Sequence, residues 1–141
     1  MENYIKMDDS NNELTFVRRK NRQSNYMTYN YPVIKLDVKI GRFSISQMLA
    51  DILIVDNNDG LMFAFNKKNK TAFLMKDGEK DAFILRRKDQ GTLRFTSKDL
   101  KQHFVETFEL LDSEIKTYVF SVSTDPNERG MYTISSCLNF Q

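Results

Sequence analysis

Residues 34–53 read IKLDVKIGRFSISQMLADIL, and this stretch is the one that decides the fold class. Its first seven residues, 34–40, alternate apolar and charged side chains, which is the period-two pattern of a strand with one buried face. Two apolar residues resume the alternation after Gly41. Ser46 is then a suitable N-cap for a short helix whose two leucines, four residues apart, share one face. The stretch therefore predicts two strands followed by a helix.

The rest of the chain continues the pattern of short strands separated by turns. We expect a second helix over 98–108 with Ser97 as its N-cap. Phe and Tyr, which strands favour, number 11 and 6, whereas Trp is absent. These observations predict a mainly β fold with two short helices, of the β or α+β class. The further strands are expected at 13–19, 61–65, 71–76, 82–88, 92–95, 116–122 and 131–135.

Two stretches of the chain show the same order of elements. Residues 43–76 and 93–135 each give a strand, a helix opened by serine, and two more strands. This pattern suggests an internal duplication of β-α-β-β halves, which would close a small barrel with pseudo-two-fold symmetry and no exposed sheet edge.

The length of 141 residues suits a single domain with one core. We expect that domain at 33–141, in halves 33–90 and 91–141. An N-terminal arm, 1–32, precedes it and carries a basic, tyrosine-rich segment.

Composition narrows the class of protein. The net charge is +2, so an argument for a nucleic-acid partner must rest on local basic patches. Cys137 is the single cysteine, which favours a reducing compartment. The N-terminus is too polar for a secretory signal, and no apolar run approaches the roughly 18 residues of a membrane span. A cytoplasmic protein with no membrane partner is expected.

Residues 34–76 contain a set of motifs with a known counterpart. A strand is followed by Gly41-Arg42, an apolar pair, a helix with two leucines, a turn, and a hairpin. This arrangement resembles the AbrB/SpoVT family of swapped-hairpin, cradle-loop barrel regulators. The resemblance implies an AbrB-like barrel and a regulatory DNA-binding function. The residues that carry the match are Gly41, Arg42, Phe43, Ile45, Leu49, Leu53, Val55, Asp59, Leu61, Phe63 and Phe65.

Several positions depart from the family pattern. Asn58 stands where the family has glycine, and asparagine is the best substitute in a left-handed conformation. Ser46 replaces the usual proline at the helix start. Ile54 replaces the helix-ending glycine, so a different local turn is expected. Ala50 and Asp51 occupy positions of the arginines that face DNA in many members, and a carboxylate there would repel phosphate.

Signals of enzymatic or metal chemistry are sparse. His103 is the single histidine, and both it and Cys137 are interpreted as structural or surface residues. Asp56 and Asp59 resemble part of a calcium loop but lack its glycine and distal glutamate, so a solvated turn is expected. We predict a non-enzymatic protein with no cofactor and no metal.

Basic residues are the remaining candidates for a binding site. The segment 18–31 combines basic residues with tyrosines, as phosphate neutralisation and base stacking require, although a solvated loop is the simpler reading. Segment 61–98 carries ten basic and four acidic residues, net +6, whereas 99–116 nets −3. The predicted nucleic-acid-binding residues are Arg18, Arg19, Lys20, Arg22, Arg42, Lys67, Lys68 and Lys70.

Two functions remain open at this point. One is DNA binding of the AbrB type through phosphate contacts. The alternative is a protein-interaction or structural adaptor, for example a phage or mobile-element accessory protein, that binds a protein partner and no DNA. The chain is expected to be a monomer if its halves close one barrel and a homodimer otherwise.

Overall fold

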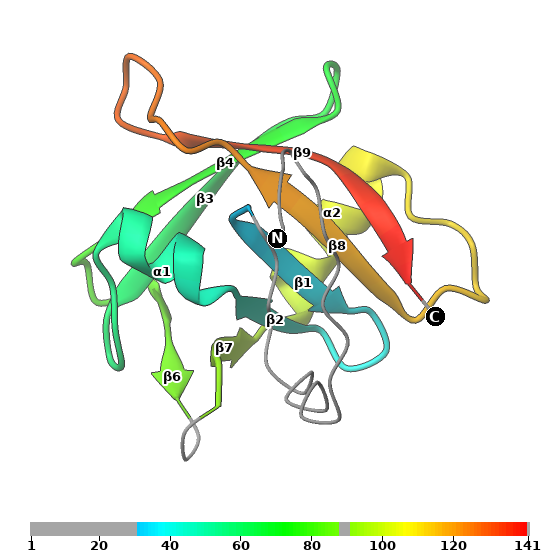
Figure 1. The fold of residues 1–141 in the computed structure, drawn as a ribbon. Helices are drawn as coiled ribbons and strands as arrows, with labels where there is room; N and C mark the ends of the chain where they lie inside the picture. Colours follow the sequence, from blue (N-terminus) through cyan, green and yellow to red (C-terminus); the bar gives the residue numbers. More distant parts are fainter. Residues whose placement is uncertain (1–30, 88–90, 141) are drawn as a thin grey trace, which may run out of the picture.

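The computed structural model describes residues 31–87 and 91–140, with side chains described up to residue 135. Almost all of the predicted N-terminal arm, including the strand expected at 13–19, lies outside the described residues. Nine strands form one antiparallel sheet that curves around a common core (Figure 1). The elements are β1 (Val33–Asp37), β2 (Arg42–Ile45), α1 (Gln47–Leu53), β3 (Gly60–Asn66), β4 (Thr71–Lys76), β5 (Phe83–Ile84), β6 (Arg86–Arg87), β7 (Leu93–Thr96), α2 (Lys98–Phe108), β8 (Thr117–Val122) and β9 (Tyr132–Phe140).

The sheet is a nearly closed barrel, which confirms the predicted fold class of mainly β structure with two helices. The strand order is β5-β3-β4-β9-β8-β1-β2-β7-β6. Its two end strands, β5 and β6, are separated in the chain by Leu85 alone. Leu85 is fully buried, and its backbone exchanges 2.8 Å hydrogen bonds with Asn58 and Asp59 just before β3. A single residue therefore joins the two ends of the sheet.

The order of strands is symmetric about two positions. Around the β4–β9 pair, the strand order reads β3-β4-β9-β8. At the β2–β7 pair, the strand that precedes α1 lies beside the strand that precedes α2. β1 pairs with both β2 and β8. In the same way, β6 pairs with β7 and β5 pairs with β3. This correspondence groups β5 and β6 with the second half, whereas the boundary at residue 90 assigns them to the first. The internal duplication itself stays a prediction.

Three expected strands differ in extent. The strand expected at 34–40 ends at Asp37, because a turn with Gly41 at a φ of +70° must precede β2 for the two strands to pair. The strand expected at 82–88 is split at Leu85, since its two parts pair with different neighbours. β9 extends to Phe140, five residues beyond the predicted end.

Both helices begin as predicted. The Ser46 hydroxyl accepts the Leu49 N–H at 3.2 Å, and the Ser97 hydroxyl accepts the Leu100 N–H at 3.1 Å. Both also end alike, with a left-handed residue, Ile54 after α1 and Glu109 after α2. The expectation of a different turn at Ile54 is therefore wrong, because the isoleucine adopts the conformation that glycine would normally occupy.

The core is rich in phenylalanine. Phe104 of α2 is fully buried, and its ring lies 5.0 Å from that of Phe43 on β2, 5.9 Å from Phe63 on β3 and 5.1 Å from Phe120 on β8, between centroids. One helical side chain thus contacts strands from both halves of the chain. Burial of such aromatic side chains is a dominant contribution to the stability of the fold.

Candidate functional site

The outer face of four neighbouring strands carries an excess of positive charge. In the register of β1, β2, β7 and β6, Lys35 lies opposite Ser44, Ser44 opposite Arg94, and Arg94 opposite Arg86. Arg42 lies two residues from Ser44 on β2, and side chains two residues apart on a strand share a face. We call Lys35, Arg42, Arg86 and Arg94 the basic sheet face.

Part of this face borders a hollow of about 450 Å³ in the barrel wall. The hollow lies where β5 turns away from β7 to pair with β3, so that the wall is left open beside residues 95 and 96. None of its eight described lining residues is acidic. They are Arg42, Ala82, Phe83, Ile84, Arg86, Arg94, Phe95 and Thr96.

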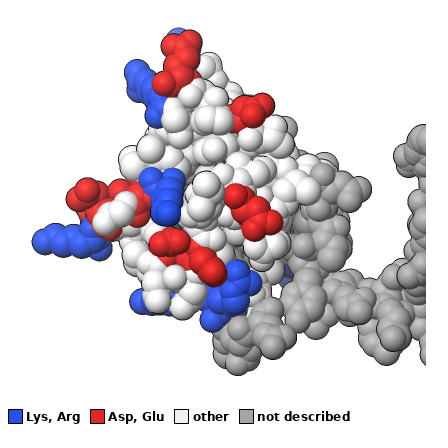
Figure 2. All heavy atoms as spheres, turned by 60° about the vertical axis from the view of Figure 1, so that its left-hand side comes forward, with Lys and Arg blue, Asp and Glu red and all other residues white. Residues whose placement is uncertain are grey.

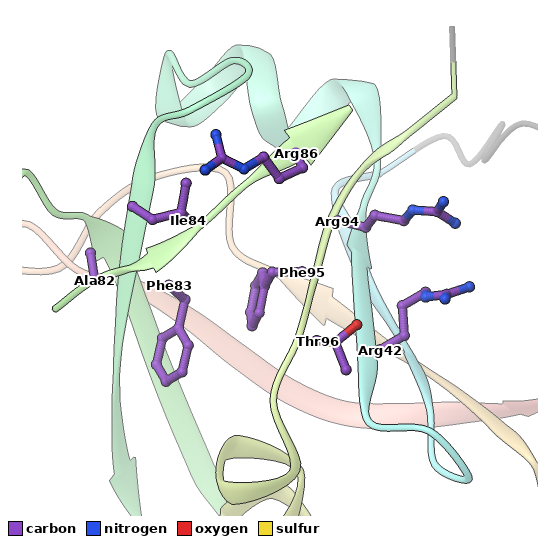
Figure 3. Close-up of a pocket in the computed structure, with 8 residues that line it drawn as sticks. All are labelled: Arg42, Ala82, Phe83, Ile84, Arg86, Arg94, Phe95 and Thr96. Atoms are coloured by element: carbon purple, nitrogen blue, oxygen red, sulfur yellow. The ribbon is translucent and has the colours of Figure 1, made fainter. Parts of the chain in front are cut away.

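The three arginines of the hollow do not converge on one point. Figure 3 shows the Arg42 and Arg94 side chains extending to the same side, one above the other, whereas Arg86 extends away from them near Ile84. Arg42 and Arg94 are half-buried, and Arg86 is exposed. Arg42 and Arg94 therefore form a pair that suits one anionic group, with Arg86 available to a second.

The charges of the basic sheet face are not neutralised within the described structure. None of its four residues forms an ion pair with a described carboxylate. Asp37 lies opposite Arg42 in the register and keeps its negative charge while its Oδ1 accepts the N–H of Lys39 at 3.2 Å, so four positive charges face one negative charge. Arg42 and Arg94, whose side chains extend to the same side (Figure 3), therefore keep their positive charges available to a bound anion.

The other predicted site residues lie elsewhere. Lys67 and Lys70, in the β3–β4 turn, donate from Nζ to Glu106 at 2.7 Å and to Glu109 at 3.0 Å. The pairing with Lys67 is the main reason why the pKa of Glu106 lies below its usual range. The turn projects at the top of Figure 1, away from β2, so Arg42 is not brought together with these lysines.

Four further candidates, Arg18, Arg19, Lys20 and Arg22, lie outside the described residues. Lys68 is exposed in the β3–β4 turn, and no described carboxylate pairs with it. The predicted site residues include Arg42 but not Lys35, Arg86 or Arg94, although Arg86 and Arg94 belong to the basic segment 61–98. The alternation of 33–37 and 93–96 would place Lys35 and Arg94 on outer faces, but the pairing of β2 with β7 could not be foreseen.

The helix face that the AbrB resemblance would assign to DNA carries no basic residue. Ala50 is buried, and the exposed Asp51 accepts a 2.9 Å hydrogen bond from Gln47 Nε2. Asn58, by contrast, has a φ of +77°, which confirms the left-handed conformation expected there. α1 therefore lacks the positive charge that phosphate contacts require, whereas the outer sheet face carries such charge.

The charged surface around α1 is mixed in sign. Figure 2, which turns the left-hand side of Figure 1 forward, shows lysine and arginine side chains interspersed with acidic ones. Arg87, next to Arg86, is paired within the chain: its Nη2 lies 3.3 Å from Asp56 Oδ1, while its Nη1 donates to the Gly91 carbonyl at 2.9 Å. Arg87 thus has a structural role and is not part of the basic sheet face.

Signals of other chemistry are also accounted for by local structure. Asp56 accepts the N–H of Asn57 at 2.7 Å, and this contact, with that of Arg87, holds the pKa of Asp56 below its usual range. His103 is exposed, with its ring stacked on Phe65 at 5.2 Å. In the described part of the chain, no group of three or more His, Cys, Asp and Glu side chains could hold a metal ion.

Among residues 31–87 and 91–140, neither helix has the length and apolarity needed to cross a bilayer. Comparison of the chain with protein-family models, with curated proteins and with solved structures finds no match.

Proposed function

We propose that this protein is a non-enzymatic module that binds nucleic acid through phosphate contacts on the basic sheet face. The observation that carries the proposal is the pair of Arg42 and Arg94, whose side chains extend to the same side (Figure 3) and are unpaired with any described carboxylate, with Arg86 lining the same hollow. Guanidinium groups bind phosphate oxygens in a bidentate manner, and such contacts supply most of the affinity of sequence-tolerant binding.

Contacts of this kind make binding depend on salt. Each phosphate neutralised on duplex DNA contributes about 0.9 to the slope of log affinity against log salt concentration. The four residues of the basic sheet face therefore support a slope of up to about −3.6 if each meets one phosphate. Lys67 and Lys70 are expected to add little, because each is already paired with a glutamate.

The test measures binding of a fluorescein-labelled 20-base-pair duplex by anisotropy over a salt series. Arg94→Gln is expected to lower the affinity and to reduce the slope by about 0.9. The same variant is expected to be about as stable as the parent, because Arg94 forms no ion pair with a described carboxylate. Loss of binding without loss of stability would separate a binding role from a structural one.

Arg129→Gln is the matched control, because it removes the same charge from an exposed turn between β8 and β9. Its salt slope should equal that of the parent. The combined Arg18/Arg19/Lys20/Arg22→Ala variant measures how much of the salt slope the N-terminal segment contributes. Binding that is absent at low salt, or that responds equally to Arg94→Gln and Arg129→Gln, would overturn the proposal.

A further inference from the structure

A second concave surface lies between the loop that follows α2 and the turn that joins β1 to β2. Its volume is about 770 Å³, larger than that of the hollow in the barrel wall. The loop is held by its own hydrogen bonds, from the Leu110 N–H to the Val105 carbonyl at 3.1 Å and from the Ile115 N–H to the Asp112 carbonyl at 3.2 Å. The groove is therefore formed before any partner arrives.

The floor of this groove is apolar. Val38, Val105 and Ile115 are half-buried and pack against the core, and Leu110 is buried. Leu111, which also lines the groove, is 80% exposed. An apolar groove of this size, with an exposed aliphatic side chain on its lining, is the kind of surface that receives the apolar face of a peptide segment.

The charges at the groove favour one kind of partner. Lys39, Lys101 and Lys116 line it, and none of them pairs with a described carboxylate. The two acidic lining residues are engaged with the backbone: Asp37 accepts the N–H of Lys39 at 3.2 Å, and Asp112 accepts that of Glu114 at 2.9 Å. The groove thus carries three lysines and two aspartates, net +1, around an apolar floor, and its ammonium groups are not paired with described carboxylates.

We propose that this groove docks a short amphipathic segment of a partner protein, with aliphatic residues on one face and aspartate or glutamate along its edges. The aliphatic residues would cover Leu111 and the floor, and the carboxylates would pair with the three lysines. The inference is independent of the proposed nucleic-acid binding, since none of the four residues of the basic sheet face lines the groove.

The probe is a phage library that displays random 16-residue peptides, selected on the full-length protein. Selected peptides should be acidic and carry aliphatic residues at helical or alternating spacing. A synthetic copy of the best peptide should lose at least about tenfold in affinity with Leu111→Asp, since a central contact is worth 1.4 kcal/mol or more. Lys101→Glu should weaken the same peptide.

Matched controls are available for both changes. Ile54→Asp replaces another exposed aliphatic residue, 77% exposed, at a left-handed position that aspartate tolerates. Lys68→Glu reverses an exposed charge in the β3–β4 turn. Both should leave peptide affinity unchanged, and Leu111→Asp should leave the DNA salt slope unchanged. The proposal fails if no peptide is enriched, if the enriched peptides are basic, or if the control variants weaken binding as much as the groove variants.

Discussion

The end of α1 supports a sharp prediction about stability. Ile54 has a φ of 56° and a ψ of 56°, a left-handed conformation that costs an L-residue about 1–2 kcal/mol. The conformation is imposed by the helix end, where the Ile54 N–H donates to the Asp51 carbonyl at 3.3 Å and the Val55 N–H to the Ala50 carbonyl at 3.0 Å. Glycine is the usual residue at this position of a helix end.

Ile54→Gly is therefore expected to stabilise the protein. The side chain is 77% exposed, so its removal forfeits little buried surface. Against the relief of strain stands the greater freedom of glycine in the unfolded chain, about 0.4–1 kcal/mol. The difference is a gain of about 0.5–1 kcal/mol, or a rise in Tm of roughly 2–4 °C for a domain of this size.

Urea unfolding, monitored by circular dichroism, gives the free energy of unfolding of each variant. Ile54→Ala is the informative control, because alanine keeps the strain of an L-residue while it also loses the exposed side chain, and it should change stability by less than glycine does. Glu109→Gly at the end of α2 should stabilise in the same way, since Glu109 has a φ of 55°. A decrease in stability of Ile54→Gly would refute the reasoning from backbone strain.

Further predictions follow from single contacts. Gly60→Ala should destabilise by about 1–3 kcal/mol, because an added Cβ would lie 2.6 Å from a backbone carbonyl oxygen, while Gly78→Ala, with nothing within 4 Å, should be silent in the same unfolding assay. Thr107→Val should stabilise by about 1 kcal/mol, because the buried Thr107 hydroxyl has no hydrogen-bond partner among the described residues. Lys67→Met should raise the pKa of Glu106 towards its usual range in an NMR titration. In the parent protein, the lowered pKa stabilises the fold at a pH above the pKa of Glu106 in the unfolded chain. This stabilisation is lost as the pH falls through the pKa of Glu106 in the folded chain. Light scattering after size exclusion should give one 16.6 kDa chain, since one chain supplies all the strands of the described sheet; a twofold mass would contradict this.

Local patterns in the sequence were sufficient for the fold class. The serines before both helices and the alternation in 34–37 and 43–45 are signals read from neighbouring residues, and they were confirmed. The predicted end of the strand at 34–40 was wrong, because that end depends on the turn that is needed to pair β1 with β2. The split at Leu85 was likewise invisible, since each part of 82–88 pairs with a strand that lies far away in sequence or across a turn.

The candidate site shows the same division between local and distant information. Lys67 and Lys70 form an evident basic cluster in the sequence, but the two glutamates that pair with them lie 39 residues further along the chain. The basic sheet face is assembled from four strands, and Arg86 lies opposite Arg94 in the register because β6 folds back on β7. The charge count over 61–98 included Arg86 and Arg94, but the predicted site residues chosen from that segment were Lys67, Lys68 and Lys70, in a turn where two of the three lysines are paired with glutamates.

The position of the β8–β9 hairpin in the sheet has a consequence for synthesis of the protein. β8 and β9 lie between β1 and β4, so both of these earlier strands keep an open edge until the last part of the chain is available. A nascent chain that has not yet exposed Thr117 and the residues after it would present two unpaired edges, which promote association between chains. We therefore expect premature termination products to form inclusion bodies, and ribosome-bound chains to need holding by a chaperone until the hairpin emerges.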